Sequence, residues 1–253
     1  MTADAAVGRR LALVLLVLFL GLGAFFRLTD LGGRNLWTDE AWVALAARQE
    51  EPRAVLALGQ STPPWYLLTV WQVCRLAGLS EASLRLTSAL FGLATLFLFW
   101  PLARRLLPLG GAVSAFILVS ISPRLVYYAK ELKQYSADAF WAVLLLLAAE
   151  RLLAHQGRKG WLLLLTTAAV GLGYSHPLVF LLPAVAAVLW WELPDQRRRI
   201  SLVFAFLGLV FSAYYLTFFR GQVDPELLIY WRPDFPDFSG FTAFWSWFGA
   251  AWL

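Results

Sequence analysis

Seven apolar stretches dominate this sequence of 253 residues and constrain its fold more than any other feature. A bilayer is crossed by backbone whose hydrogen bonds are satisfied internally, so long apolar runs predict membrane-spanning helices. Hydrophobic residues make up 60% of the chain and charged residues 15%, against about 25% charged in a soluble domain. We therefore predict an all-α polytopic transmembrane helical bundle. The expected spans are residues 11–28, 83–106, 109–126, 135–153, 161–174, 177–191 and 200–219.

A further apolar segment, residues 64–79, does not fit a span. As a helix it covers only about 24 Å, and Thr69, Gln72 and Arg75 give it a polar stripe at three-residue spacing. If it lies in the membrane interface instead, all the main basic clusters fall on one side, as expected for the cytoplasmic side. These clusters are Arg9/Arg10, Arg104/Arg105, Arg151/Arg158/Lys159 and Arg197/Arg198/Arg199.

The amino terminus is then cytoplasmic, and polar chemistry is expected on the outer side. A first outer loop, residues 29–82, holds the helix just described and a second interfacial helix at residues 37–50. Residues 1–220 form the predicted transmembrane domain. Residues 221–253 form an outer loop rich in proline and aromatic residues, which we expect to be truncated.

Composition excludes several classes of protein. One cysteine and two histidines exclude a disulfide framework and a cysteine-based zinc site. The net charge of +5 comes from cations spread over loops, which is typical of membrane topology and not of a nucleic-acid-binding groove. No ionisable residue falls in the middle of an expected span, which disfavours an ion-coupled transporter. Neither a metal site nor a cofactor is indicated.

Asp39 and Glu40 open the first interfacial helix and are the first candidate catalytic residues. Acidic residues are favourable at the start of any helix, so one interpretation is helix capping alone. The other is catalytic: a carboxylate at the membrane surface, flanked by Trp37 and Trp42, can act as a general base toward an acceptor hydroxyl.

The segment 127–135 gathers Lys130, Glu131, Lys133 and Tyr135 between two expected spans. It fits a solvated loop with snorkelling lysines and an aromatic belt. It also fits a phosphate cradle, because ammonium and phenol groups stabilise the charge that grows on a phosphate leaving group, while Glu131 orients a lysine or an acceptor.

Two further candidate residues lie at outer ends of expected spans. Arg85 either anchors its helix at the interface or contacts a lipid phosphate. His176, in an outer turn, is either a structural turn residue or a contact for a phosphate or sugar.

Taken together, these residues resemble the bacterial protein-mannosyltransferase-like group (glycosyltransferase family 39) of the membrane-embedded GT-C glycosyltransferases, whose relatives include the lipid A aminoarabinose transferase. The likeness runs from about residue 11 to residue 220 and rests on the order of its motifs. They are the acidic pair Asp39–Glu40, Pro63–Pro64–Trp65–Tyr66, and the segments 83–92, 127–135 and 173–176.

The resemblance implies a GT-C fold in the bacterial plasma membrane. It also implies sugar transfer, usually with inversion, from a polyprenyl-phosphate carrier to a protein, lipid or glycan acceptor on the outer side. By the same likeness Asp39 acts in catalysis, with Glu40 beside it. The family's Glu-x-Arg-x-Tyr element corresponds to Glu131, Lys133 and Tyr135, and its Tyr-x-His element to Tyr174 and His176.

The sequence departs from the family pattern at two positions. Thr62 stands where relatives commonly have His or Lys, and Lys133 replaces an arginine, which keeps the charge but loses a bidentate fork. The leading hypothesis is a glycosyltransferase in which Asp39 is the base and Arg85, Lys130 and Lys133 stabilise the departing phosphate. A carrier-lipid transporter and a non-catalytic fragment or scaffold are the alternatives.

Overall fold

The computed structural model describes residues 3–59, 61–222, 225–236 and 238–251, and these residues form helices without any strand. The all-helical prediction is therefore confirmed. The helices are α1 (Ala3–Leu28), α2 (Thr38–Ala47), α3 (Pro52–Ala57), α4 (Pro64–Ala77), α5 (Glu81–Leu106), α6 (Leu109–Ile121), α7 (Pro123–Ala129), α8 (Tyr135–Ala154), α9 (Arg158–Gly171), α10 (Leu178–Glu192), α11 (Arg197–Tyr214), α12 (Pro225–Trp231) and α13 (Phe241–Ala251).

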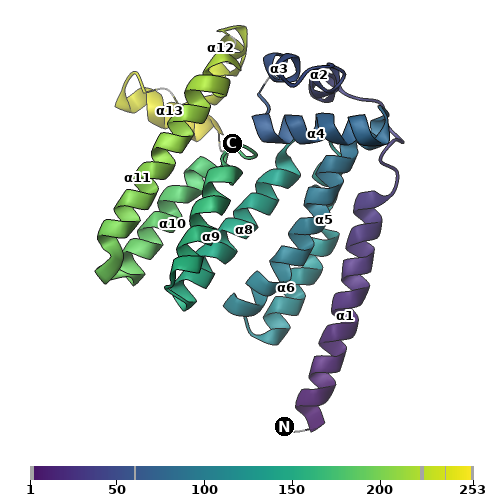
Figure 1. Cartoon of the computed structure of the whole chain (residues 1–253), viewed down its shortest axis with the longest axis vertical. Coiled ribbons are helices and arrows are strands. Elements are labelled where there is room, and N and C mark those ends of the chain that lie inside the picture. The colour runs from purple at the N-terminus through teal and green to yellow at the C-terminus, as the bar shows by residue number, and fades with distance from the viewer. Residues whose placement is uncertain (1–2, 60, 223–224, 237, 252–253) are drawn as a thin grey trace.

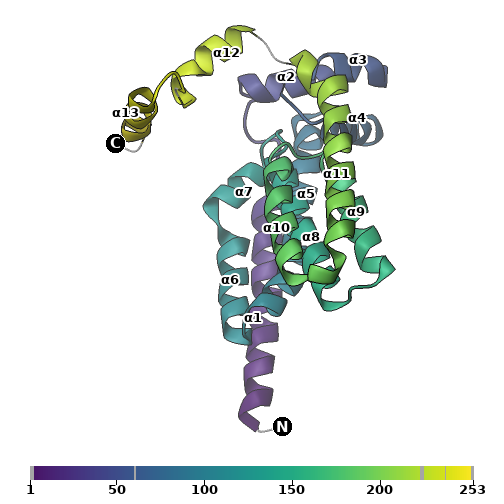
Figure 2. The same ribbon diagram turned by 90° about the vertical axis from the view of Figure 1, so that its left-hand side faces the viewer.

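The long helices run side by side as a bundle, and α2, α3 and α4 lie across one end of it (Figure 1). Within the bundle α5 packs on α8, α1 on α6, and α8 on α9. The long loop between α1 and α5 caps one end of the bundle. At the opposite end α9 begins and α10 finishes, each next to a short turn. In Figure 2 the segment α12–α13 leads away from the bundle.

The buried face of α4 explains why this loop packs against the bundle. Its buried side chains Tyr66, Leu67, Val70 and Cys74 follow helical spacing and face α5 and the core. The Tyr66 hydroxyl shares a 2.7 Å hydrogen bond with Ser88 of α5, so the buried polar group on this face has a partner. The polar stripe seen in the sequence lies on the other side of α4.

In the part of the chain that the structure describes, three helices are long and apolar enough to cross a membrane: Val7–Leu28, Glu81–Leu106 and the helical segment Pro194–Gln222. A fourth is added if α6 and α7 count as one bent span. Of the remaining expected spans, α8 carries three charged residues, and α9 and α10 have only 14 and 15 residues. The chain has the apolar helices of a multi-pass membrane protein, while the expected number of seven crossings stays a prediction.

The expected span 109–126 is wrong as a single helix. The structure breaks it after Ile121, and α6 and α7 meet at an angle of 49°. Pro123 is the reason, because it has no N–H to continue the ladder of α6 and instead takes the first position of α7.

Candidate functional site

Glu40 is the centre of the contacts that join the capping helices to the bundle. Its carboxylate is fully buried and receives Arg85 Nε at 2.9 Å, Arg85 Nη2 at 2.8 Å and the Leu132 N–H at 2.8 Å. These bonds lower the pKa of Glu40 against the opposing effect of its burial, so it is ionised. We define the pair Glu40–Arg85 with its backbone partners as the clasp.

Arg85 does not fit the expected role of a phosphate ligand. The side chain is fully buried, and its donors reach the Glu40 carboxylate and three carbonyls, those of Leu31, Arg34 and Asn35, at 2.9 to 3.3 Å. A guanidinium has five N–H donors, and these five contacts occupy them. The expectation for Arg85 is therefore corrected: it holds the loop after α1 and has no donor free for a lipid.

Glu40 is corrected in the same way as a catalytic candidate. A carboxylate that is enclosed and fully bonded cannot reach an acceptor hydroxyl. Its contribution is positional, because one carboxylate ties together the start of α2, the first turn of α5 and the loop between α7 and α8.

Asp39, one residue earlier in α2, points the other way. Its side chain is 46% exposed and lies 3.7 Å from Lys133 Nζ, while the Lys133 side chain is only 8% exposed. A hydrogen bond between their chain neighbours explains this pairing: the Leu132 N–H donates to the Glu40 carboxylate. Because Lys133 follows Leu132 and Asp39 precedes Glu40, this bond brings Lys133 and Asp39 together. The clasp thus sets an accessible carboxylate beside a nearly buried ammonium, and only the carboxylate is open to solvent.

The other members of segment 127–135 are dispersed. Lys130 Nζ donates to the Thr29 carbonyl at 3.3 Å, at the end of α1, while the Lys130 carbonyl accepts from Arg34 Nη2 at 2.9 Å. Tyr135 is exposed and its ring packs 4.8 Å from that of Tyr128. Of the two expected phosphate lysines, the structure brings only Lys133 to Asp39.

Glu131 lies inside the loop and not on its surface. It is 2% exposed, and its Oε2 atom has no hydrogen-bond partner among the described residues. Burial raises the pKa of its carboxyl, and the neighbouring Arg34 only partly offsets this. Sequence reasoning missed Arg34 as a neighbour of Glu131.

A pH prediction follows from Glu131. Folding raises the pKa of the Glu131 carboxyl above its ordinary value of 4.5, so between these two pKa values the folded state binds more protons than the unfolded state. The folded state therefore loses stability as the pH rises from 4.5 through the raised pKa. We expect Glu131→Gln to flatten this decline, so that the Tm gap between pH 5 and pH 8 narrows relative to wild type. The exposed Glu51→Gln should leave the gap unchanged. An equal gap in Glu131→Gln would contradict the assignment.

Tyr174 and His176 occupy the turn between α9 and α10. The Tyr174 hydroxyl is 3.0 Å from Thr69 Oγ1 of α4, and its ring stacks on Trp141 at 5.2 Å. The His176 ring packs edge-on against Phe219 at 4.6 Å, and its Nε2 atom is buried without a partner. Burial first, and the charge of Lys133 second, lower the pKa of His176 to about 4, so its imidazole is neutral at neutral pH.

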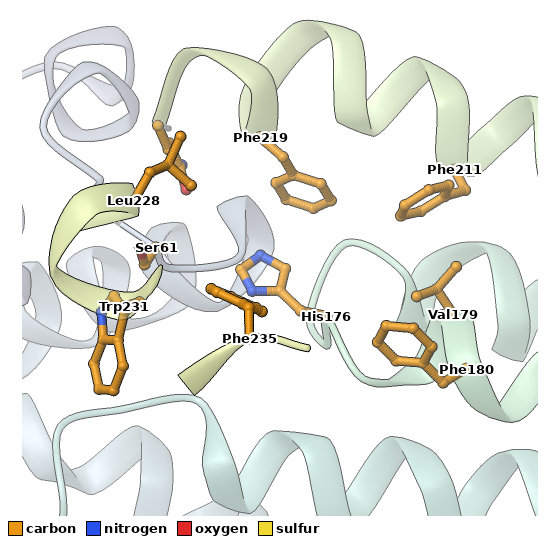
Figure 3. A pocket seen from close by; sticks show the side chains of 10 residues that line it. Ser61, His176, Val179, Phe180, Phe211, Phe219, Leu228, Trp231 and Phe235 are labelled. Carbon is orange, nitrogen blue, oxygen red and sulfur yellow. The ribbon is translucent and has the colours of Figure 1, made fainter. Parts of the chain in front are cut away.

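His176 is at the centre of a cavity of about 410 Å³ (Figure 3). Apolar walls come from α10, from α11 and the turn after it, and from α12 and the segment after it, and the polar side chains are those of Ser61, His176 and Gln222. The lining residues are Ser61, His176, Val179, Phe180, Phe211, Phe219, Gln222, Leu228, Trp231 and Phe235. Such a pocket suits an apolar ligand with one polar end. Nothing in the sequence alone pointed to Ser61 and Gln222.

In the described ranges, no three His, Cys, Asp or Glu side chains lie together so as to hold a metal ion. Thr62, at the position that departs from the family pattern, is fully buried.

The comparisons with known proteins agree with the membrane character of the fold. The family model described as dolichyl-phosphate-mannose-protein mannosyltransferase matches residues 61–218, which run from the start of α4 through α11. No curated protein and no solved structure matches the chain. The matched region contains Arg85, Lys133 and His176, and it begins after Asp39 and Glu40.

Proposed function

The chain belongs to the dolichyl-phosphate-mannose-protein mannosyltransferase family, and from this premise we propose that it is an inverting glycosyltransferase with a polyprenyl-phosphate sugar as donor. Its acceptor is a hydroxyl group of a protein, lipid or glycan on the outer side of a bacterial plasma membrane. Within the family, we place it with the bacterial family-39 enzymes and the lipid A aminoarabinose transferase. No cofactor takes part in this proposal.

The proposed orientation follows from the basic loops. The amino terminus is cytoplasmic, and α2 and α4 lie at the outer interface, within the loop 29–82. In this proposal the transmembrane domain is residues 1–220, and residues 221–253 lie in a further outer segment. The capped end of the bundle, with Asp39, then faces outward.

The observation that carries the proposed chemistry is the pair of Asp39 and Lys133, 3.7 Å apart. Asp39 removes the proton of the acceptor hydroxyl as its oxygen attacks the anomeric carbon. The bond from that carbon to the phosphate oxygen breaks, its electron pair stays on the phosphate, and Lys133 stabilises the added charge. A phosphate leaves readily, so one base suffices.

The cavity beside His176 supports a lipid-linked donor. The carbonyl of Ser61, which lines this pocket, accepts from Gln134 Nε2 at 3.4 Å, and Gln134 is the residue after Lys133. A neutral imidazole there contributes a hydrogen bond and not a charge, so Lys133 is the cation that we assign to the phosphate. Tyr135, Tyr174 and Glu131, which lie outside the lining of this cavity, are proposed as supporting residues that do not carry the charge.

The proposal is tested with purified protein in vesicles, supplied with a radiolabelled pool of polyprenyl-phosphate sugars and an acceptor membrane extract. We expect label to leave the carrier and enter a protein, lipid or glycan fraction, with inverted anomeric configuration in the product. Label that crosses the vesicle membrane while remaining on its carrier would identify a transporter instead. Label that stays in place would indicate a non-catalytic scaffold.

Lys133→Ala is expected to raise the KM for the donor by about tenfold or more, because it removes a charge-assisted contact to the phosphate. The KM for the acceptor should change little. Lys159→Ala, an exposed lysine at the opposite end of the bundle, is the matched control and should behave as wild type. An unchanged donor KM in Lys133→Ala would remove the phosphate role from this residue.

A further inference from the structure

Arg27, near the end of α1, is a buried cation with no carboxylate partner among the described residues. It is 1% exposed. Its Nη1 atom donates to the carbonyls of Gly23 at 3.0 Å and Ser120 at 2.7 Å, and its Nη2 atom donates to the carbonyl of Val119 at 3.0 Å. A buried charge requires a strong compensating reason. Here the compensation comes from backbone carbonyls at the end of another helix.

Those carbonyls are free because of Pro123. In an unbroken α-helix the Val119 carbonyl accepts from the N–H of residue 123, and the Ser120 carbonyl from that of residue 124. Pro123 has no N–H, and the 49° bend between α6 and α7 opens the next bond as well. The guanidinium therefore supplies the donors that the break removes, at the negative end of the α6 dipole.

At Gly92, α5 lies close to both Arg27 and the end of α7. A Cβ atom placed on Gly92 of α5 would lie 3.4 Å from Arg27 Cδ and only 2.8 Å from Ala129 Cβ, the last residue of α7. The absence of a side chain at Gly92 lets α7 rest on α5 at this angle. Arg27 thus binds the carbonyls at the bend, and α5 packs against both α6 and α7.

The end of α7 leads directly into the loop that carries Lys133. Two more bonds join this loop to the chain after α1: Lys130 Nζ to the Thr29 carbonyl at 3.3 Å, and Arg34 Nη2 to the Lys130 carbonyl at 2.9 Å. The direction in which α7 leaves the bend therefore decides where residues 130–134 meet α2.

We propose that Arg27 is a positioning residue: it fixes the bend between α6 and α7 through the carbonyls of Val119 and Ser120, and the bend aims Lys133 at Asp39. The effect on sugar transfer rests on the function proposed above. The effect on the position of the loop does not.

Two variants separate positioning from stability. Arg27→Met keeps an apolar stem but leaves the carbonyls unpaired, so we expect Tm to fall on the order of 5 °C and transfer to fall about 100-fold. In Arg27→Met/Pro123→Ala, residue 123 regains an N–H for the Val119 carbonyl and the helix can straighten. We expect Tm to recover while transfer stays low. Arg124→Met, an exposed neighbour of Pro123, is the control and should match wild type.

A second measurement does not need enzyme activity. With Cys74→Ala as background, Asp39→Cys/Lys133→Cys is treated with a short bis-maleimide, and the yield of the internal cross-link reports whether the loop faces α2. We expect a high yield with Arg27 and a several-fold lower yield in both Arg27→Met and Arg27→Met/Pro123→Ala. Equal yields in all three, or recovery of transfer together with Tm in the double variant, would overturn the proposal. If wild type transfers no sugar, the proposed function fails and the cross-link still decides the role of Arg27.

Discussion

Asp39→Asn is expected to lower the rate of sugar transfer by roughly 10²- to 10⁴-fold, the range typical for loss of a general base. Asparagine keeps the size of the side chain but cannot accept the proton of the acceptor hydroxyl. Because Asp39 is 46% exposed and, among the residues that the structure describes, forms an ion pair only with Lys133, the fold should tolerate this change. Initial rates with saturating donor and acceptor, in vesicles, measure the effect.

Two comparisons make this result specific. Asp195→Asn, an exposed carboxylate near the opposite end of the bundle, should transfer sugar like wild type. The KM for the donor should remain within about threefold in Asp39→Asn, since the base acts on the acceptor and its loss appears in kcat. Transfer by Asp39→Asn at the wild-type rate would show that another group removes the proton.

Arg85→Met is expected to cost roughly 3–5 kcal/mol of folding free energy, because the buried Glu40 carboxylate loses its hydrogen-bonded cation and keeps only the partly exposed Arg34, at 3.5 Å. Three carbonyls, those of Leu31, Arg34 and Asn35, lose their donor in the same change. The loss should appear as a large drop in Tm and as poor recovery of folded protein. Arg104→Met, an exposed arginine at the other end of α5, is the matched control.

A double-mutant cycle tests whether the clasp acts as one unit. Glu40→Gln alone should also destabilise the protein, since it removes the charge that compensates buried Arg85. In Glu40→Gln/Arg85→Met neither charge remains buried, so the loss should be clearly smaller than the sum of the single losses. Additive losses would contradict a direct pairing. The cycle is read from thermal or denaturant unfolding and does not depend on catalysis.

The sequence by itself determined the class of fold and most of its helices. Apolar runs of this length and abundance have one stable solution, helices packed in lipid, and each expected span contains a helix in the structure. Two of the three helices described in the first loop, α2 and α4, were also readable, because Pro64 and the acidic pair Asp39–Glu40 are strong signals for a helix start, whereas the short α3 was not predicted. The break in α6–α7 was readable in principle from Pro123, but the apolar run across it masked the signal.

Only the tertiary structure decided which polar side chains lie together. Asp39 and Glu40 are neighbours in sequence, yet residues one apart on a helix point about 100° away from each other, so packing buries one and exposes the other. The sequence suggested that Arg85 contacts a lipid phosphate, but in the structure it donates instead to Glu40, 45 positions away. Arg27 gave no sequence signal, because the carbonyls that it binds become free only when Pro123, 96 positions later, bends another helix. Such pairings depend on which helices are neighbours. The hydrophobic pattern of a helix predicts that one of its faces is buried, but it does not predict which other helix covers that face.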